Sequence, residues 1–265
     1  MPATPNARPD LALNSSATVR RFDDLVDAPP IAAAVPLEAL RSDSRTPIQM
    51  NDTVSASSPG RKIKQARGRK TYDALIATGF KLLENQELEA ISIAELAKAA
   101  GYSVGAFYAR FRSKNEFFDA MIAQHLEYRT KARGRLFSKE PDETLVDTMI
   151  GELVRYYWRR RRFWRAALIR SVRSPDFWEP LRQHGRMYAD MLIARMSTKA
   201  QRPLTETEQT NVRFAFQIAL GTINNAIINR PGPIMLGQTL FVANLARAFR
   251  LVSGYDSLMG IAPQV

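Results

Sequence analysis

The residues best suited to a chemical role in this sequence are arginines and lysines at two places. The first is a run of six within ten residues, uninterrupted by an acid: Arg61, Lys62, Lys64, Arg67, Arg69 and Lys70. Such a run can follow phosphates or enter a minor groove, although a solvated linker held extended by its own charge has the same composition. The second is Arg110, whose planar guanidinium matches the two acceptors on the edge of guanine. Both places offer recognition of a nucleic acid.

Groups for catalysis and metal binding are sparse. The chain has no cysteine, and its two histidines are His125 and His184. Disulfides and thiolate metal sites are therefore excluded, and we expect His125 to be a packing or surface group rather than a ligand. The sequence has no glycine-rich phosphate loop, no cluster of metal ligands and no Ser, His and Asp set. We expect no enzyme, no cofactor and no metal site.

Composition sets the class of protein. With 265 residues the chain can hold one large or two small domains, and 45% hydrophobic residues are ample for a core. The net charge of +12 favours polyanionic partners. No apolar run approaches the ~20 residues that span a bilayer, and the first residues lack the apolar core of a signal peptide. We expect no membrane partner and a cytoplasmic, nucleoid-associated protein.

Three helix starts lie close together in the sequence. Ser92 with Glu95 forms a capping-box pattern, in which the serine oxygen accepts from the backbone three residues on and the glutamate reaches back. Ser103 is placed to cap a second helix, and Ser113 with Glu116 repeats the capping-box pattern. These positions predict two short helices and the start of a third.

The apolar residues between these caps follow helical spacing. Gly101 can adopt the left-handed conformation that ends the first helix. The expected apolar face of the second helix is Val104, Phe107, Tyr108 and Phe111, with Phe107 and Phe111 assigned to the core. An earlier helix carries an apolar face from Tyr72 to Leu83. Together these elements predict a three-helix core with a helix-turn-helix, whose second helix is short enough to lie in a major groove.

The segment from Ile93 to Phe118 resembles the DNA-binding segment of the tetracycline-repressor (TetR) family. It joins a capped helix, an Ala-x-x-Ala-Gly-x-Ser turn, a Phe-Tyr-x-x-Phe helix and a Ser-Lys-x-Glu helix start in register. With the preceding helix, the close resemblance covers about a quarter of the chain. It implies an all-α fold, in which an N-terminal three-helix helix-turn-helix DNA-binding domain precedes a helical effector-binding and dimerisation domain.

The resemblance also implies a role for individual residues. Phosphates would be contacted by Ser92, Tyr108 and Lys114. The groove would be faced by Tyr102, Ser103, Val104, Ala106, Ala109 and Arg110. Two of these, Ala106 and Ala109, replace the Thr and His often found there, and they offer methyl contacts alone. Shape readout through the basic run, with Arg67 and Arg69, can compensate.

We divide the chain into three segments. Residues 1–60 hold five basic and seven acidic residues, a net charge of −2, and their composition predicts a disordered tail. Residues 61–135 are the expected DNA-binding domain with its basic arm. Residues 136–265 have helical patterns throughout and are the expected ligand-binding and dimerisation domain. Within this segment, we expect the four arginines 159–162 to form a solvated helix end.

Two C-terminal helices are the expected dimerisation pair. Thr205 with Glu208 forms a capping-box pattern that opens the first of them. Apolar stripes on the pair supply the expected interface residues: Phe216, Leu220, Ile223, Ile227, Leu245 and Phe249. The resemblance implies a four-helix interface between two chains, and the alternative is a monomeric core. A two-fold dimer places its recognition helices about 34 Å apart on a palindromic site.

The resemblance further implies an effector pocket formed by residues of about 142–197. Its expected lining is aromatic with an adaptable methionine: Tyr157, Phe163, Trp164, Trp178, Tyr188 and Met191. The function that follows is a homodimeric regulator, most simply a repressor of a double-stranded DNA operator that an unidentified small-molecule effector releases. The alternatives are a charge-driven architectural DNA-binding protein and an enzyme of the helical region.

Overall fold

Helices make up the described part of the chain, so the all-α prediction is confirmed. The computed structural model describes residues 59–262, with the side chains of 67–130 and 134–262, and the predicted tail therefore lies outside the described residues apart from its last positions. In chain order the elements are α1 (Pro59–Leu82), α2 (Ile93–Ala99), α3 (Val104–Tyr108), α4 (Lys114–Lys139), α5 (Asp142–Arg159), α6 (Arg161–Arg173), the 3-10 helix η3 (Pro175–Trp178), α7 (Glu179–Lys199), α8 (Glu206–Ile228), α9 (Thr239–Ser253) and α10 (Tyr255–Met259).

The three serine caps of the helix-turn-helix are present. The Oγ atoms of Ser92, Ser103 and Ser113 accept backbone hydrogen bonds of 3.0, 3.2 and 3.1 Å from the amide three residues on. Gly101 between α2 and α3 has a φ of +79°, the left-handed conformation expected of it. Each cap satisfies one amide that the helix start leaves without a partner. The predicted starts of α2, α3 and α4 are therefore confirmed.

A capping box also needs a hydrogen bond from the cap residue's amide to the glutamate side chain. Of the three predicted boxes, one has this second hydrogen bond. Glu208 accepts from the Thr205 amide at 2.8 Å and completes the box at the start of α8. Glu95 instead accepts from the Gln86 side chain at 2.8 Å. Glu116 accepts from the amide of Arg112, one residue before the cap, at 2.7 Å. In both cases the glutamate accepts from another donor in place of the amide of the serine cap.

Two predictions about local structure are wrong. The basic run belongs to α1, which begins at Pro59, rather than forming an arm ahead of the first helix. Its Arg, Lys, Gln and Ala residues are good helix formers, so nothing separates the run from the helix that follows. The expected apolar face of α3 also splits, because Val104 and Tyr108 are exposed while Phe107 and Phe111 are buried. The two buried rings already fill the core beneath this short helix.

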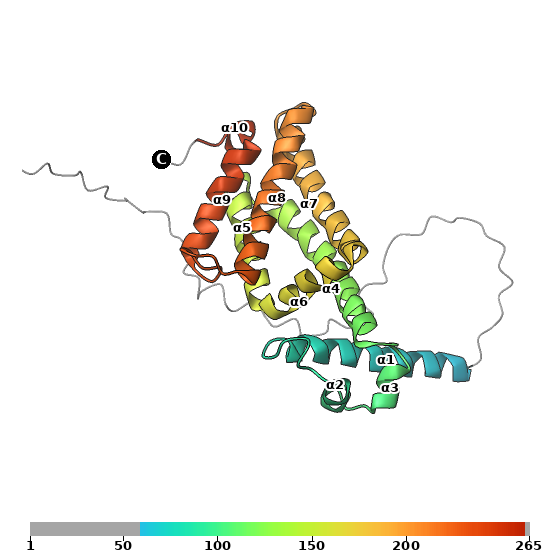
Figure 1. Cartoon of the computed structure of the whole chain (residues 1–265). Coiled ribbons are helices and arrows are strands. Elements are labelled where there is room, and N and C mark those ends of the chain that lie inside the picture. Colours follow the sequence, from blue (N-terminus) through green and yellow to red (C-terminus); the bar gives the residue numbers. More distant parts are fainter. Residues whose placement is uncertain (1–58, 263–265) are drawn as a thin grey trace, which may run out of the picture. The chain divides into compact units, whose positions relative to one another are not determined.

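Helix α4 joins the helix-turn-helix to the C-terminal helices without a break. It contacts α1 at one end and α5 and α7 further along (Figure 1). It passes through residue 135, the predicted domain boundary, and ends at Lys139. All described helices belong to one compact unit. The division into domains stays a prediction.

Helices α8 and α9 lie side by side, and α9 also packs on α5 (Figure 1). The rings of Phe216 and Phe249 meet edge to face between α8 and α9, 4.9 Å apart. Gly254, with a φ of +65°, ends α9 and turns the chain into α10, an element that the sequence patterns did not predict.

Gly79 of α1 is buried against the ring of Phe117 on α4. A Cβ atom built there would lie 2.5 Å from Phe117 Cζ and 3.1 Å from the Met121 sulfur. We expect Gly79→Ala to lower the free energy of unfolding by up to about 2 kcal/mol, because an overpacking cost of about 1–3 kcal/mol outweighs the helix-propensity gain of roughly 1 kcal/mol. Urea unfolding measures the change, and Gly134→Ala, at an open site on α4, is the control that should not destabilise.

Candidate nucleic-acid interface and internal sites

The outward side of α3 forms the candidate recognition surface. Ser103, Val104, Tyr108 and Ala109 are exposed there, and Ala106 is half-buried between them. Tyr108 leaves 53% of its surface exposed, whereas Phe107 beside it leaves none. The caps and the buried rings therefore hold α3 rigidly while its other side stays open. Of the remaining predicted contacts, Ser92 and Tyr102 lie at the two ends of α2, exposed and half-buried respectively.

Arg110 lies just beyond α3 and turns toward α1. Its Nε donates to the Gly68 carbonyl at 3.1 Å, and its Nη1 donates to the Ala109 carbonyl at 3.2 Å. A Cβ on Gly68 would come within 2.7 Å of the guanidinium, so the absence of a side chain there permits the contact. Arg67 and Arg69 lie exposed on the same turn of α1. The structure thus brings the three predicted DNA-contacting arginines together, with Arg110 occupied by a backbone carbonyl.

Lys114, a predicted phosphate contact, is half-buried at the start of α4. Its Nζ donates to the Glu89 carbonyl at 3.1 Å. Burial lowers the pKa of this ammonium, although the carboxylates of Glu89 and Glu95 act in the opposite direction. Lys114 therefore ties the turn before α2 to α4, in addition to any contact with DNA.

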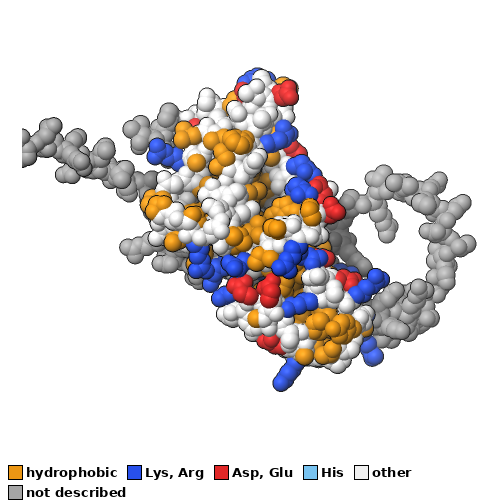
Figure 2. Space-filling model, in the orientation of Figure 1, with side chains coloured by type: hydrophobic (Ala, Val, Ile, Leu, Met, Phe, Trp, Pro, Cys, Tyr) orange, Lys and Arg blue, Asp and Glu red, His pale blue; other side chains and the backbone are white. Residues whose placement is uncertain are grey.

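Arginines of α6 and of the turn before it contact the helix-turn-helix unit. The guanidinium of Arg160 lies 4.4 Å from the centroid of the Phe80 ring on α1. Arg162 donates to the Glu84 carbonyl and lies 3.7 Å from the Glu87 carboxylate. The interpretation of residues 159–162 as a solvated helix end is therefore wrong for these two arginines. Figure 2 shows basic and acidic side chains interspersed in a band across this face of the molecule.

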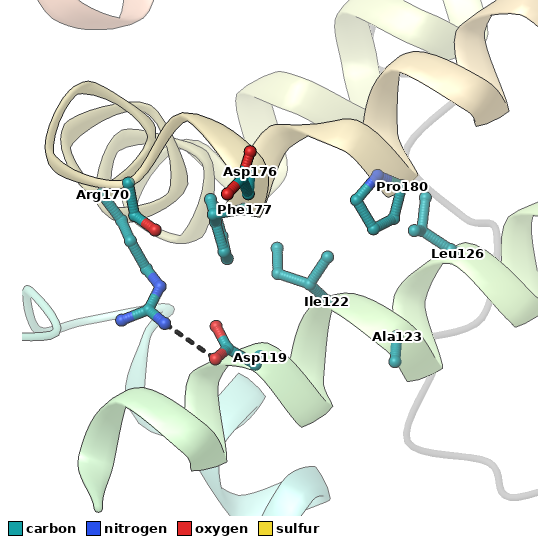
Figure 3. Close-up of a pocket in the computed structure, with 9 residues that line it drawn as sticks. Asp119, Ile122, Ala123, Leu126, Arg170, Asp176, Phe177 and Pro180 are labelled. Carbon is teal, nitrogen blue, oxygen red and sulfur yellow. Dashed lines mark hydrogen bonds and ion pairs between the residues drawn. The ribbon is translucent and has the colours of Figure 1, made fainter.

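A cavity of about 310 Å³ lies where α4, α6 and η3 meet (Figure 3). Arg170 of α6 points across it to Asp119 of α4, with 2.7 Å between Nη2 and Oδ2. Ile122, Leu126 and Pro180 form an apolar wall on the other side. Burial raises the pKa of Asp119, although Arg170 acts in the opposite direction. A second cavity of about 350 Å³ shares Arg170 and Ser174 with the first.

The six residues predicted to line an effector pocket do not line either cavity. Four are buried and packed on one another or on neighbouring rings: Tyr157, Phe163, Trp164 and Tyr188. The rings of Tyr157 and Trp164 stack with centroids 4.2 Å apart. Trp178 and Met191 are half-buried. The predicted pocket thus corresponds to a closed aromatic cluster in this structure, and its role in ligand binding stays a prediction.

Sequence reasoning missed two residues of these internal sites, Arg129 and Arg170. Arg129 lies among mostly polar residues in the sequence, yet its side chain is buried. Its position could have indicated this burial. Arg129 continues the helical spacing of Ile122 and Leu126 on α4, so it lies on the side of α4 that faces α7. Arg170 carried no comparable signal, because its partner Asp119 is 51 residues away.

The predicted dimer-interface residues face the chain's own core, which corrects that part of the prediction. Five of the six are buried and Leu220 is half-buried. The reason is that α9 covers this face of α8, and both pack inward. A neighbouring stripe on each helix is exposed instead. On α8 it includes Phe214, Gly221, Thr222, Asn225 and Ile228, and on α9 Leu240, Ala243, Asn244, Arg247 and Leu251.

The described residues meet the requirements of neither a metal site nor a membrane-spanning helix. No group of three His, Asp or Glu side chains among them is arranged to hold a metal ion. No helix in the described part of the chain is long and apolar enough to cross a membrane. His125 is buried, and its Nδ1 lies 2.5 Å from the Tyr156 hydroxyl.

The helix-turn-helix segment of this chain is similar to known bacterial transcriptional regulators. The family model of bacterial regulatory proteins, tetR family, matches residues 75–121. The chain is 33% identical over 91 residues to YvdT of Bacillus subtilis, named an uncharacterized HTH-type transcriptional regulator, covering 34% of this chain and 45% of YvdT. It is 38% identical over 53 residues to YwcC, a regulator of the same type and organism, covering 20% and 24%. The chain thus spans less than half the length of these relatives.

The fold has a counterpart among solved structures. A tetR-family transcriptional regulator from Streptomyces coelicolor superposes with a TM-score of 0.52 at 19% identity, covering 72% of this chain and 86% of that chain. At this identity the likeness establishes the fold alone. The matched segment 75–121 includes α2, α3 and the start of α4, the elements that build the recognition surface.

Proposed function

We propose, from the premise that this chain belongs to the TetR family of bacterial regulatory proteins, that it is a sequence-specific transcriptional regulator. It binds a palindromic operator as a homodimer, represses, and is released by a small-molecule effector. The observation that supports this proposal most is α3 itself: a short helix, capped by Ser103 and seated on Phe107 and Phe111, with its other side exposed. Such a helix fits a major groove.

The exposed stripes of α8 and α9 support the homodimer. Phe214 leaves 49% and Leu251 73% of its surface exposed, values that are high for large apolar side chains. Gly221 has no atom within 4 Å of a built Cβ, so a second backbone can approach closely there. A two-fold dimer through these stripes presents two α3 helices to successive major grooves, about 34 Å apart.

The contacts between α6 and the helix-turn-helix support effector control. Arg160, Arg162 and Arg170 each contact α1, the turn that follows it, or α4. A ligand that moves α6 must therefore move these contacts and the orientation of α3. Release from DNA follows if the ligand binds more tightly to the arrangement in which two α3 helices no longer match the operator.

A second function, charge-driven binding to any duplex, is favoured by two observations. Arg110 is occupied by the Gly68 carbonyl, and Ala106 and Ala109 offer methyl groups alone to the bases. Under this alternative, affinity depends steeply on salt and hardly on sequence.

Arg110→Ala separates the two functions. If Arg110 leaves Gly68 and contacts guanine, the variant loses discrimination at one base position of each half-site by about 1–3 kcal/mol. Competition binding with single-base operator variants measures this loss. Arg112→Ala removes the same charge from an exposed position two residues on and serves as the matched control. Equal weakening of both variants on all sequences would favour the charge-driven function.

The proposed function is tested by incubating the protein with a random duplex library at near-physiological salt and sequencing the retained DNA. We expect a palindrome with half-sites about one helical turn apart. Retention without an enriched motif would overturn sequence-specific regulation and support the charge-driven alternative.

A further inference from the structure

Arg129 of α4 is a buried cation that pairs with no carboxylate in the described part of the chain. It leaves 8% of its surface exposed. Its Nη2 lies 3.5 Å from the Tyr188 hydroxyl, and its guanidinium lies 4.7 Å from the centroid of the Tyr156 ring. Among the described residues no carboxylate forms an ion pair with it, although carboxylates pair with Arg170, Arg195 and Arg250 elsewhere. A hydroxyl and an aromatic face compensate a buried charge incompletely.

The surroundings of Arg129 include a second cation and an unused donor. The guanidinium of Arg160 lies 5.7 Å from the same Tyr156 ring. The Nε1 of Trp164 is buried and has no hydrogen-bond acceptor in the described structure. Trp164 belongs to the same cluster, because its ring centroid is 6.2 Å from that of Tyr156. Positive charge and an unused N–H group therefore meet in an aromatic interior where no carboxylate of the described residues pairs with either arginine.

The cavity of about 310 Å³ is lined along α4 by residues whose helical spacing Arg129 continues, and Arg129 itself lies beyond this lining. Asp119, Ile122 and Leu126 of α4 line it, at helical spacing, and Arg129 continues the same row one turn further, a rise of about 4.5 Å. On the facing helix α7, Pro180 lines the cavity and Tyr188, two turns later, contacts Arg129. Ile122, Ala123, Leu126 and Pro180 belong to the apolar part of the cavity lining, and Asp119, Arg170 and Asp176 form the charged part (Figure 3). Its volume falls in the range of small-ligand pockets.

We propose that Arg129 anchors the carboxylate of an organic acid whose apolar body occupies the cavity between α4 and α7. The proposal rests on the proposed effector control and specifies the chemical class of the effector. A carboxylate receives charge-assisted, bidentate hydrogen bonds from the guanidinium and supplies the missing counter-charge. Because Arg129 belongs to the helix that begins beside α3, the ligand is attached directly to the element that positions the recognition surface.

The test uses octanoate and 1-naphthoate, each beside its neutral amide, in calorimetric titrations of the full chain. Wild type should bind at least one of the two acids with a Kd below about 1 mM and its amide more weakly. Arg129→Met, which keeps most of the side-chain volume, should weaken binding of the acid by about tenfold or more and leave the amide within about twofold. Arg135→Met, at an exposed position on the same helix, is the matched control.

A second readout needs no ligand. If Arg129 is kept for binding, Arg129→Met should hold or raise the melting temperature of the ligand-free protein, since it removes an unpaired buried charge. A lowered melting temperature with unchanged acid binding would show a structural role and overturn the proposal. Failure of both acids to bind, or equal binding of acid and amide, would also overturn it. Stabilisation by inorganic anions alone would replace the organic acid with a small ion and overturn the proposed class.

The two proposals can fail separately. Operator binding by wild type and Arg129→Met, with and without the bound acid, reports on regulation independently. Arg129-dependent acid binding that leaves the protein on its operator would contradict effector release but keep the binding site.

Discussion

Phe107→Ala is expected to unfold the helix-turn-helix unit and abolish DNA binding. The Phe107 ring is fully buried, and its centroid lies 5.3 Å from that of Phe111 and 5.6 Å from that of Phe117. Truncating such a ring costs about 3–5 kcal/mol, because the contacts are lost and a cavity remains. That cost is comparable to the stability of a small helical unit. Urea unfolding and hydrogen exchange of α2 and α3 amides measure the loss.

The neighbouring tyrosine provides the control. Tyr108→Ala removes a ring that is 53% exposed, so it should change the free energy of unfolding by no more than about 0.5 kcal/mol. It should nevertheless weaken DNA binding if Tyr108 contacts phosphate. The structural account of α3 would be contradicted if Phe107→Ala unfolded like wild type, or if Tyr108→Ala were the more destabilised variant.

Phe214→Glu combined with Leu251→Glu is expected to convert the protein to monomers and to weaken operator binding by about 10²-fold or more. Both side chains are exposed in the single chain, so the substitutions disturb no contact of its own core. In the proposed interface the four glutamates of two chains would be desolvated close together. Sedimentation analysis measures the assembly state, and titration of operator DNA measures the affinity.

Val172→Glu is the matched control for the dimer, because Val172 of α6 is an apolar side chain with 84% of its surface exposed outside the stripe. It should leave both assembly and DNA binding unchanged. A double glutamate variant that remains dimeric would show that α8 and α9 do not pair through these stripes. A variant that is monomeric yet binds the operator as tightly as wild type would contradict the need for a dimer.

The helix-turn-helix could be predicted from the sequence because its signals are local. A serine three residues before a free amide caps a helix wherever the chain places it, and Gly101 ends α2 by its own backbone conformation. The failures at Glu95 and Glu116 are equally physical. Each carboxylate found a donor outside the cap, from Gln86 and Arg112 respectively.

The faces of α8 and α9 could not be assigned from the sequence. The stripe of Phe216 and Ile223 and the stripe of Phe214 and Ile228 are both apolar enough to be buried. Which one faces the core depends on how α9 and α5 pack, and that information lies far away in the chain. The sequence therefore indicated two apolar faces, but not which of them the chain's own core buries.

Long-range contacts limited the prediction of the sites in the same way. Arg110 donates to the backbone carbonyl of Gly68, 42 residues away, and Arg162 donates to the backbone carbonyl of Glu84, 78 residues away. Neither pairing has a local signature, so both arginines were interpreted from composition and position. The buried Arg129 was recognisable only by its spacing from apolar neighbours on α4.

The central claim is that a dimer of this chain reads a DNA sequence, and the ratio of two dissociation constants tests it most directly. One constant is for the duplex recovered from the random library, and the other is for a scrambled duplex of the same length at the same salt. We predict a ratio of about 10³ or more, with two chains or a multiple of two on each operator. A ratio near one, with a steep salt dependence on both duplexes, would contradict the claim.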